Sequence, residues 1–480
     1  MLLLAWYNYF SIYIQNDQLM FKAIIIFIVF CSLSAAAFSQ HEHHMPAGNH
    51  PATMKKDTTK PAMEHNMDMH MEMNREVPMS HAFSLNLPMN RNGSGTGWLP
   101  DASPMYGYML HSKNWMYMIH GSIFPGYTNQ DLTSKGSRGD QKFSVPNWFM
   151  LMAQRKVGEK GLFHYNIMLS LDRLTEGGNG YPLLFQSGES WKNVPLVDRQ
   201  HPHDLFSELS VSYSYAFSKK IDAFVYVGYP GEPALGSVAF MHRPSSLPNP
   251  DAPISHHWND GTHITFGVAT IGVRFDKFKL EGSSFTGREP DEDRYNFDKA
   301  RFDSWSGRLS FNPSDNWSLQ VSHGFTKSPE ALHPDEDVKR TTASAIYSLP
   351  LNNDNWLNAT ALWGLNKTAG HDGENALLLE GAMGLHKVTL YTRYEWVQKS
   401  NEELNLPEVT YGKDALFPVN AFTAGLNYDL LQFAKTRLAV GGHLTFYDAD
   451  NKLNNLYGKN PLSLQLFLRI YPGLMKMDMQ

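Results

Sequence analysis

Apolar and polar side chains alternate along segments of about ten residues from Tyr106 onward, and turn residues separate these segments. In Glu208–Phe217, every second residue from Leu209 onward is apolar, whereas the residues between them are Glu or Ser up to position 214. Successive side chains of a strand point to opposite faces, so each such segment has one apolar and one polar face. This pattern predicts an all-β fold, namely a transmembrane antiparallel β-barrel with a polar lumen.

The lengths of the connections favour the same fold. Short turns, such as those near 158–161, 218–220, 312–316 and 385–387, alternate with long loops, as in outer-membrane barrels. The long loops are expected near 128–145, 174–203, 230–261, 288–300, 326–338, 366–375, 398–417 and 448–461. Eight outer loops predict about sixteen strands with both chain ends in the periplasm, and fourteen strands if one hairpin is misassigned.

A soluble β-sandwich or β-propeller is the alternative, because its strands also alternate. Two features favour the barrel over it: aromatic residues recur at strand ends, as in membrane-interface girdles, and the long loops all fall on one side. A repeat of propeller type is absent from the sequence. The segment Leu462–Tyr471 alternates up to the end and is expected to be the strand that closes the barrel.

The N-terminal region has the features of an export signal over residues 20–40. Lys22 provides the positive start, Ala23–Phe30 is apolar, and small residues lead to a cleavage site near Ser39 or Gln40. We interpret residues 1–19 as a miscalled start. Cys31, the only cysteine, would leave with the signal, so the mature chain is expected to have no disulfide.

A segment rich in methionine and histidine follows the signal and is assigned to residues 41–90, ahead of a barrel at 91–480. Thioether and imidazole groups are ligands for soft metals, so this strip without cysteine favours Cu(I) or Ag(I) over Zn(II). The candidate ligands in it are His41, His43, His44, Met45, His50, Met63, His65, Met67, Met69, His70, Met71 and Met73. Its prolines disfavour regular structure, and the alternative is a disordered linker whose composition is incidental.

The same residue types continue into the first predicted strands. If Trp115, Tyr117 and Ile119 face lipid, their neighbours face the lumen and form a Met/His stripe across adjacent strands. The candidate ligands of the stripe are Met116, Met118, His120, His164 and Met168, with Met150 and Met152 on the strand between. Such sites suit monovalent copper that passes from site to site. The alternative is that methionine serves here as a flexible apolar filler.

The outer loops contain a second group of histidines, in the motifs DRQHPHD (198–204), MHRP (241–244) and HHWNDGTH (256–263). His201 and His203 lie two residues apart, on one face of an extended chain, and are candidate metal ligands together with a carboxylate such as Asp204 or Asp260. The alternative, which we favour at this stage, is an inward-folded constriction held by ordinary hydrogen bonds and ion pairs. The absence of HExxH and GxSxG motifs argues against an enzyme.

Charge limits the partners further. The net charge is −6 and the chain has no basic block, which excludes nucleic acid as an expected partner, because phosphate binding needs clustered Lys and Arg. Inward charges such as Arg308, Arg393, Glu380 and Glu395 are typical of any water-filled barrel. His443 is expected to face the lumen as a hydrogen-bonding residue.

Together, the signal, the strip with HEHHMPAGNH and MEHNMDMHMEM, and the barrel pattern resemble the copper-resistance outer-membrane protein B family. DRQHPHD also resembles an uncharacterised family of bacterial outer-membrane proteins. The first resemblance implies a role in copper tolerance, by sequestration in the periplasm or export across the outer membrane.

The expected function is therefore non-enzymatic binding of Cu(I), with copper as the bound ion and outer-membrane lipid around the barrel. Periplasmic copper proteins or efflux components are the expected partners. A general porin-like channel for small solutes is the first alternative, and a metal-dependent barrel hydrolase is the second.

Overall fold

The computed structural model describes residues 79–133, 136–352 and 354–475. The signal peptide and the candidate ligands from His41 to Met73 lie outside these described residues, so they remain predictions. Among the described residues, no helix has both the length and the apolar content needed to cross a membrane.

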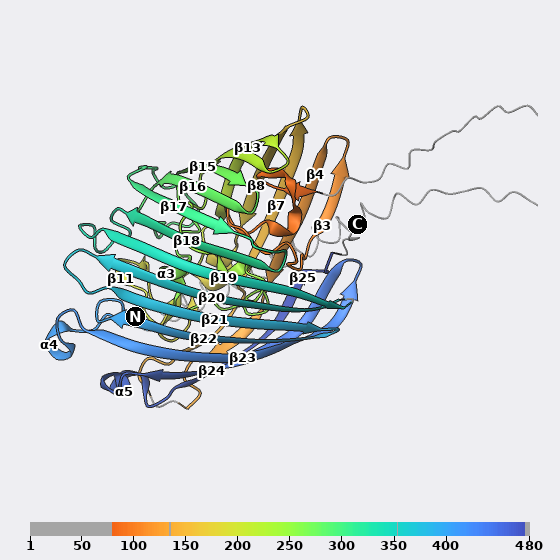
Figure 1. The fold of residues 1–480 in the computed structure, drawn as a ribbon. Helices are drawn as coiled ribbons and strands as arrows, with labels where there is room; N and C mark the ends of the chain where they lie inside the picture. The colour runs from red at the N-terminus through yellow and green to blue at the C-terminus, as the bar shows by residue number, and fades with distance from the viewer. Residues whose placement is uncertain (1–78, 134–135, 353, 476–480) are drawn as a thin grey trace, which may run out of the picture. The chain divides into compact units, whose positions relative to one another are not determined.

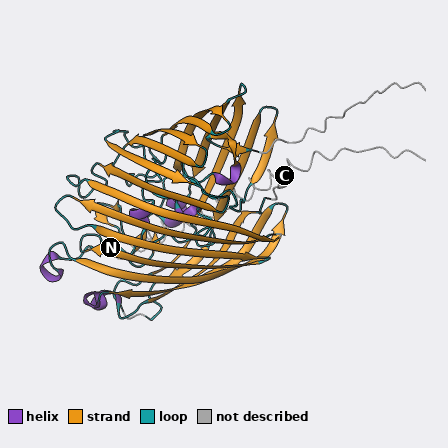
Figure 2. Ribbon diagram, viewed as in Figure 1, coloured by secondary structure: helices purple, strands orange, loops and turns teal. Residues whose placement is uncertain are grey.

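The described chain forms a closed antiparallel barrel of sixteen strands, as the alternation predicts. Its wall (Figures 1 and 2) runs through β4 (Trp115–Ile123), β5 (Gly126–Asn129), β6 (Gln141–Ser144), β7 (Asn147–Val157), β8 (Gly161–Leu169), β13 (Phe206–Ser218), β14 (Ile221–Gly228), β15 (Val268–Phe275), β16 (Phe278–Phe285), β17 (Ser304–Phe311), β18 (Trp317–Thr326), β19 (Val338–Asn352), β20 (Asn355–Thr368), β21 (Glu374–Leu385), β22 (Val388–Ser400), β23 (Leu416–Phe433), β24 (Thr436–Ala449) and β25 (Leu462–Pro472).

Two of the wall strands are interrupted. β4 continues into β5 and β6 into β7, and the breaks fall at Pro125 and Pro146, which lack the backbone N–H that a ladder needs. The backbone N–H of Phe124 donates to the carbonyl of Pro146 (2.9 Å) and joins the two breaks. β25 closes the barrel against β5, and the short β3 (Tyr108–Ser112) pairs with β4.

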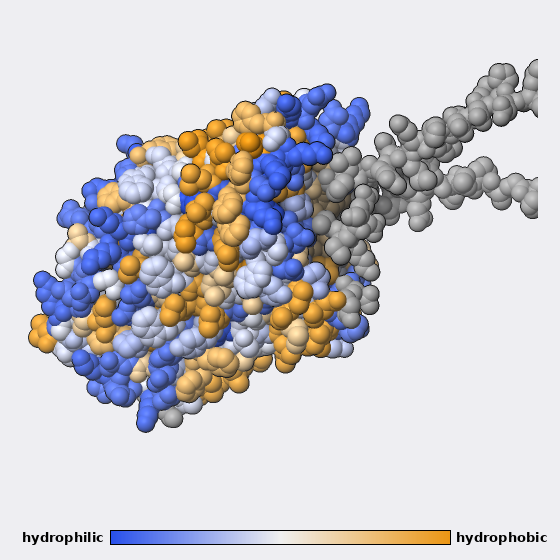
Figure 3. Space-filling model, in the orientation of Figure 1, coloured by the Kyte–Doolittle hydropathy of each residue, from blue (hydrophilic) through white to orange (hydrophobic). Residues whose placement is uncertain are grey.

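The two faces of the wall differ as the alternation predicts. On β13, Val211 and Phe217 are 48% and 59% exposed, whereas Glu208 and Ser214 are buried. On the face in Figure 3, apolar side chains gather over the strands, between more hydrophilic ends. The outward side chains therefore suit lipid, and the inward ones form a polar interior.

Seven of the eight predicted long loops are present in the described wall, but β20 and β21 are joined by residues 369–373 alone, a connection as short as the turn 312–316. Small elements lie in these loops: α2 (Asp172–Glu176), β9 (Tyr181–Pro182), β10 (Ser190–Trp191), β11 (Val194–Pro195), β12 (Arg199–Gln200), η3 (Phe240–His242), α3 (His256–Asn259), α4 (Glu408–Tyr411), η4 (Asn451–Leu453) and α5 (Asn454–Tyr457).

The segment that precedes the wall strands lies inside the barrel. There, β1 (Ser80–His81) pairs with β2 (Ser84–Pro88), and η2 (Met89–Arg91) follows. Ser84 Oγ donates to Asp222 Oδ2 (2.7 Å), and Arg308 Nη2 donates to Thr96 Oγ1 (2.8 Å). Asp222 and Arg308, the wall residues in these two contacts, face the lumen near the short turns. Residues 79–105 thus form an interior plug, whereas the sequence predicts a periplasmic segment up to position 90 and a barrel from 91 onward.

The loop between β14 and β15, residues 229–267, also folds inward. Arg243 at its centre is fully buried: Nη1 lies 2.5 Å from Asp260 Oδ2, and Nε lies 3.0 Å from Glu380 Oε2. Trp258 of α3 is fully buried as well, and α3 contacts β19, β20 and β21 (Figure 1). Hydrogen bonds and ion pairs hold this loop in the lumen, as the constriction interpretation expects.

Candidate functional site

Methionines from three adjacent wall strands meet on the lumen face. The registers of β4, β7 and β8 place Met118 opposite Met152, and Met150 opposite both His120 and Met168. These four methionines are at most 5% exposed, which confirms the predicted inward face of the strands. Met116 is partly buried and packs on the same group.

The plug and the inward loop add further methionines to this group. The complete set, here called the methionine cluster, comprises Met79, Met89, Met105, Met109, Met116, Met118, Met150, Met152, Met168, Met241 and Met475, together with Phe240, Ala252 and Trp148. Thioethers therefore converge from the wall strands, from the plug, from η3 and from the C-terminal end of the described chain.

Two histidines border the methionine cluster. The ring centroid of His120 lies 5.3 Å from that of Trp148 and 5.7 Å from that of His242, which belongs to η3. The Nε2 atom of His120 is buried without a hydrogen-bond partner. Burial lowers the pKa of His242 to about 4, so its imidazole is neutral near pH 7 and keeps a lone pair for a metal ion.

A cavity runs between these groups and joins the two donor types. Its lining includes Met105, Met118, Met150, Met152, His120, His242 and Trp148. Among the described residues, the lining contains no carboxylate, and Arg469 is its only charged residue. Hard cations prefer carboxylate and carbonyl oxygen, whereas thioether and imidazole suit Cu(I) and Ag(I). The donor types of this lining therefore suit a soft monovalent ion.

His164 also faces the lumen and is 1% exposed. Its ring lies 6.1 Å from that of Phe83, which belongs to a separate apolar cluster, and its Nε2 atom is buried without a partner. The structure thus confirms the predicted orientation of His164, but its ring contact is with the plug.

The structure brings His201 and His203 together with His256, His257 and His263 in a second buried group, here called the histidine cluster. Its side chains come from the loop after β12 and from the HHWNDGTH segment. The two clusters meet at η3: Phe240 belongs to the methionine cluster, and its ring centroid lies 5.5 Å from that of His256.

Sequence reasoning did not assign several members of the methionine cluster, among them Met105, Met241 and Met475. They lie outside the periodic strand segments, so alternation says nothing about their direction. One signal was available: residues 234–241 of the outer loop are unusually apolar for a solvated loop, which predicts that they are buried inside the barrel.

No protein-family model matches this chain, and no curated protein sequence is significantly similar to it. Solved structures with a similar fold are outer-membrane proteins. OmpF of Salmonella typhi is 11% identical (TM-score 0.47, 76% of this chain and 100% of that one). An anion-selective porin from Comamonas acidovorans is 10% identical (TM-score 0.45, 74% and 99%), and OmpT of Vibrio cholerae is 9% identical (TM-score 0.43, 75% and 100%). The likeness is confined to barrel architecture, and the described chain is a closed β-barrel with an apolar outer face.

Proposed function

We propose that this outer-membrane barrel binds Cu(I) in its methionine cluster and contributes to copper tolerance by sequestration or export. One observation carries the proposal: thioethers from separate parts of the fold line a carboxylate-free cavity together with His120 and His242. Thioether sulfur is neutral and polarisable, so it can replace the hydration shell of a soft ion without adding charge to the lumen.

Apolar filling is the plainer explanation of buried methionine, since this side chain fits irregular gaps. It does not account for the buried, unpartnered Nε2 of His120 at the edge of the same group. A buried polar atom without a partner costs about 1–3 kcal/mol, and a bound ion would remove that cost.

Within this proposal, the tract at residues 41–73 captures the ion in the periplasm and the methionine cluster receives it. Periplasmic copper proteins or efflux components would supply the ion. No catalytic step is required. The resemblance to the copper-resistance outer-membrane protein B family supports this assignment.

A small-solute channel is the second candidate. The sixteen-stranded wall favours it, because barrels of 16–18 strands are wide enough for an aqueous channel. The plug and the inward loop occupy part of that width. Single-channel conductance in planar bilayers tests this candidate, and steady conductance unaffected by Cu(I) or by loss of methionines would favour it over copper binding.

A Cu(I) competition titration on the full-length protein tests the copper proposal. The triple variant Met118→Leu, Met150→Leu and Met152→Leu keeps side-chain volume but removes three thioethers. We expect its affinity at this site to fall at least about 100-fold, since loss of even an outer-shell partner of a metal ligand costs about 10- to 100-fold. Met383→Leu, on β21 and outside the methionine cluster, should bind as the wild type does.

A deletion of residues 41–78 separates the tract from the methionine cluster and retains Met79. It should reduce the number of Cu(I) ions bound per chain while the ions held by the methionine cluster remain. Equal Cu(I) affinity in the triple variant and the wild type, with or without the tract, would overturn the proposal.

A further inference from the structure

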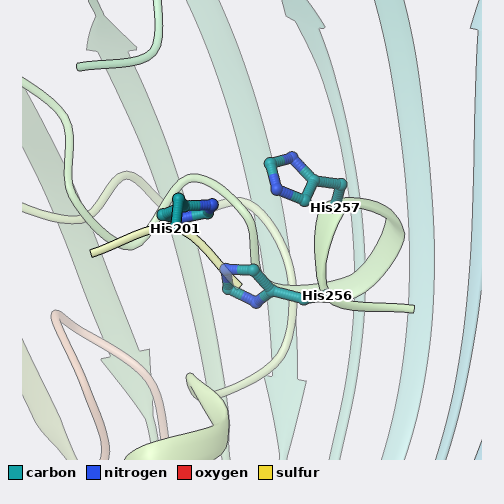
Figure 4. A group of neighbouring side chains, drawn as sticks. All are labelled: His201, His256 and His257. Atoms are coloured by element: carbon teal, nitrogen blue, oxygen red, sulfur yellow. The ribbon is translucent and has the colours of Figure 1, made fainter. Parts of the chain in front are cut away.

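The five rings of the histidine cluster pack against one another in the lumen (Figure 4 shows three of them). The ring centroids of His256 and His263 lie 4.9 Å apart, those of His256 and His257 5.3 Å, and those of His203 and His263 5.4 Å. His201 lies 5.7 Å from His257 by the same measure. Four of the rings are buried, and His263 is partly buried.

Most of these rings are held at Nδ1 by an acceptor. The contacts are His203 Nδ1 to Asp172 Oδ2 (2.6 Å), His256 Nδ1 to Asp260 Oδ1 (2.6 Å), His257 Nδ1 to Glu289 Oε1 (3.2 Å) and His263 Nδ1 to the Asp260 carbonyl (3.0 Å). An acceptor at Nδ1 places the proton there and leaves the Nε2 lone pair free. Histidines that ligate metals through Nε2 are usually held in this way.

Four other nitrogens of these rings have no hydrogen-bond partner among the described residues. They are Nε2 of His203, His257 and His263, and Nδ1 of His201, all buried. Nε2 of His201 lies 3.3 Å from Glu189 Oε1. This ring therefore also has one nitrogen at an acceptor and one without a partner, but the roles of Nδ1 and Nε2 are exchanged. Buried polar atoms in native proteins are nearly always satisfied, and four unsatisfied imidazole nitrogens in one cluster point to a bound ligand.

His201, His256 and His257 form the tightest group. One ligand atom from each lies within 4.8 Å of those of the other two, and Figure 4 shows His256 and His257 extending from α3 toward His201. Nitrogens about 2.0 Å from one ion lie about 3.3 Å apart in a tetrahedron, so binding requires the three rings to close slightly.

The surrounding charge suits a divalent cation. The carboxylates of Asp172, Glu189, Asp260 and Glu289 lie against four of the five rings. Carboxylates thus surround the rings, in contrast to the cavity at the methionine cluster.

We propose that the histidine cluster is a separate binding site for a divalent late first-row transition ion, with Cu(II) bound more tightly than Zn(II). Imidazole suits such ions, and their affinities rise to Cu(II) and fall again at Zn(II). His201, His256 and His257 hold the ion, and His203 and His263 border it. The proposal does not depend on Cu(I) binding by the methionine cluster.

Electron paramagnetic resonance of the full-length protein with Cu(II) tests this site. The variant used for this test has Gln in place of His at positions 41, 43, 44, 50, 65 and 70, so that the histidines of the N-terminal tract cannot compete for Cu(II). We expect one tightly bound Cu(II) per chain with hyperfine coupling to three imidazole nitrogens. Absence of a nitrogen-coordinated ion would overturn the proposal.

Substitutions identify the ligands. In the same background, the double variant His201→Gln and His257→Gln should bind Cu(II) at least about 100-fold more weakly. If the double variant does not fold, the single variant His257→Gln tests the same assignment, because Gln at 257 can still donate to Glu289. This single variant should lose one coupled nitrogen. His443→Gln is the matched control, because His443 is a buried lumen histidine bound to Asp251 and Tyr391. Unchanged Cu(II) affinity and nitrogen coupling in the folded His257→Gln variant would overturn the assignment.

The same samples distinguish this proposal from the proposed function. Ag(I), which mimics Cu(I), should still bind the His201→Gln and His257→Gln double variant. Loss of Cu(II) binding with unchanged Ag(I) binding supports a separate histidine site. Simultaneous loss of both ions in folded protein would contradict the separation.

Discussion

The methionine cluster and the histidine cluster share one lumen and meet at Phe240, yet the structure holds their donor atoms in different ways. The methionines lie in an apolar group whose cavity lining contains no carboxylate. The histidines are fixed by carboxylates and a backbone carbonyl, and arginines neutralise part of that charge. Flexible neutral thioethers adapt to a soft ion, whereas oriented imidazoles suit an ion with a stricter geometry.

Some of the carboxylates around the histidines are themselves paired with arginines. Because the histidine cluster depends on these buried ion pairs, it is the more fragile region. Arg294 lies 3.1 Å from Asp204, and burial raises the pKa of Glu189 to about 7 although Arg294 opposes this. Arg243 outweighs burial at Asp260 and lowers the pKa of that carboxyl. Removal of an arginine should therefore disturb the histidine cluster before the methionine cluster.

The largest effect is expected from Arg243→Met. Arg243 is fully buried between Asp260 and Glu380, so its removal leaves buried carboxylates without their partner. We expect the free energy of unfolding to fall by about 3–5 kcal/mol, measured by urea titration in lipid vesicles. Lys220→Met, at an exposed ion pair with Asp276, should change it by about 1 kcal/mol or less. Equal effects of the two variants would contradict this view of the loop.

A smaller effect is expected from Glu289→Gln, which alters the group that orients His257 while keeping its size. Loss of such an orienting carboxylate lowers metal affinity about 10- to 100-fold. We expect that decrease for Cu(II), by competition titration, and no change for Cu(I). Glu292→Gln is the control, since Glu292 accepts from the backbone N–H groups of Lys192 and Asn193. A decrease in Cu(I) affinity equal to that of Cu(II) would show that the clusters act as one site.

The smallest effect is expected from Phe240→Leu, at the junction of the two clusters. The smaller side chain leaves a cavity and should lower the free energy of unfolding by about 1–2 kcal/mol. Because Phe240 supplies no metal ligand, the Cu(I) and Cu(II) affinities should change by less than about threefold. A tenfold change in either one would assign a direct role to this ring.

Strand positions were predictable because a wall strand has only two faces. Lipid requires one apolar face, so the direction of Met168 followed from alternation, and that of Met118 followed once His120 and the aromatic residues were used to choose the lumen face. The closing strand and seven of the eight long loops followed from the same period and from loop length, whereas the loop expected near 366–375 is a five-residue turn.

The histidine cluster was only partly predictable. The sequence motifs contained all five histidines, but their pairing with Asp172 and Glu289 joins loops far apart in the chain. The short interval in DRQHPHD indicated that His201 and His203 would be neighbours. It did not indicate that α3 would direct His256 and His257 toward them.

The sequence by itself determined the barrel, a count of about sixteen strands and the donor types, because the two-residue period and the soft side chains are local properties. Tertiary structure decided that residues 79–105 and the loop 229–267 fill the lumen, and thereby which donors meet. These segments have no period, and their positions depend on buried long-range partners such as Asp222 for Ser84 and Glu380 for Arg243. Burial makes those pairings specific, since each charged or polar group enclosed in the barrel needs a partner.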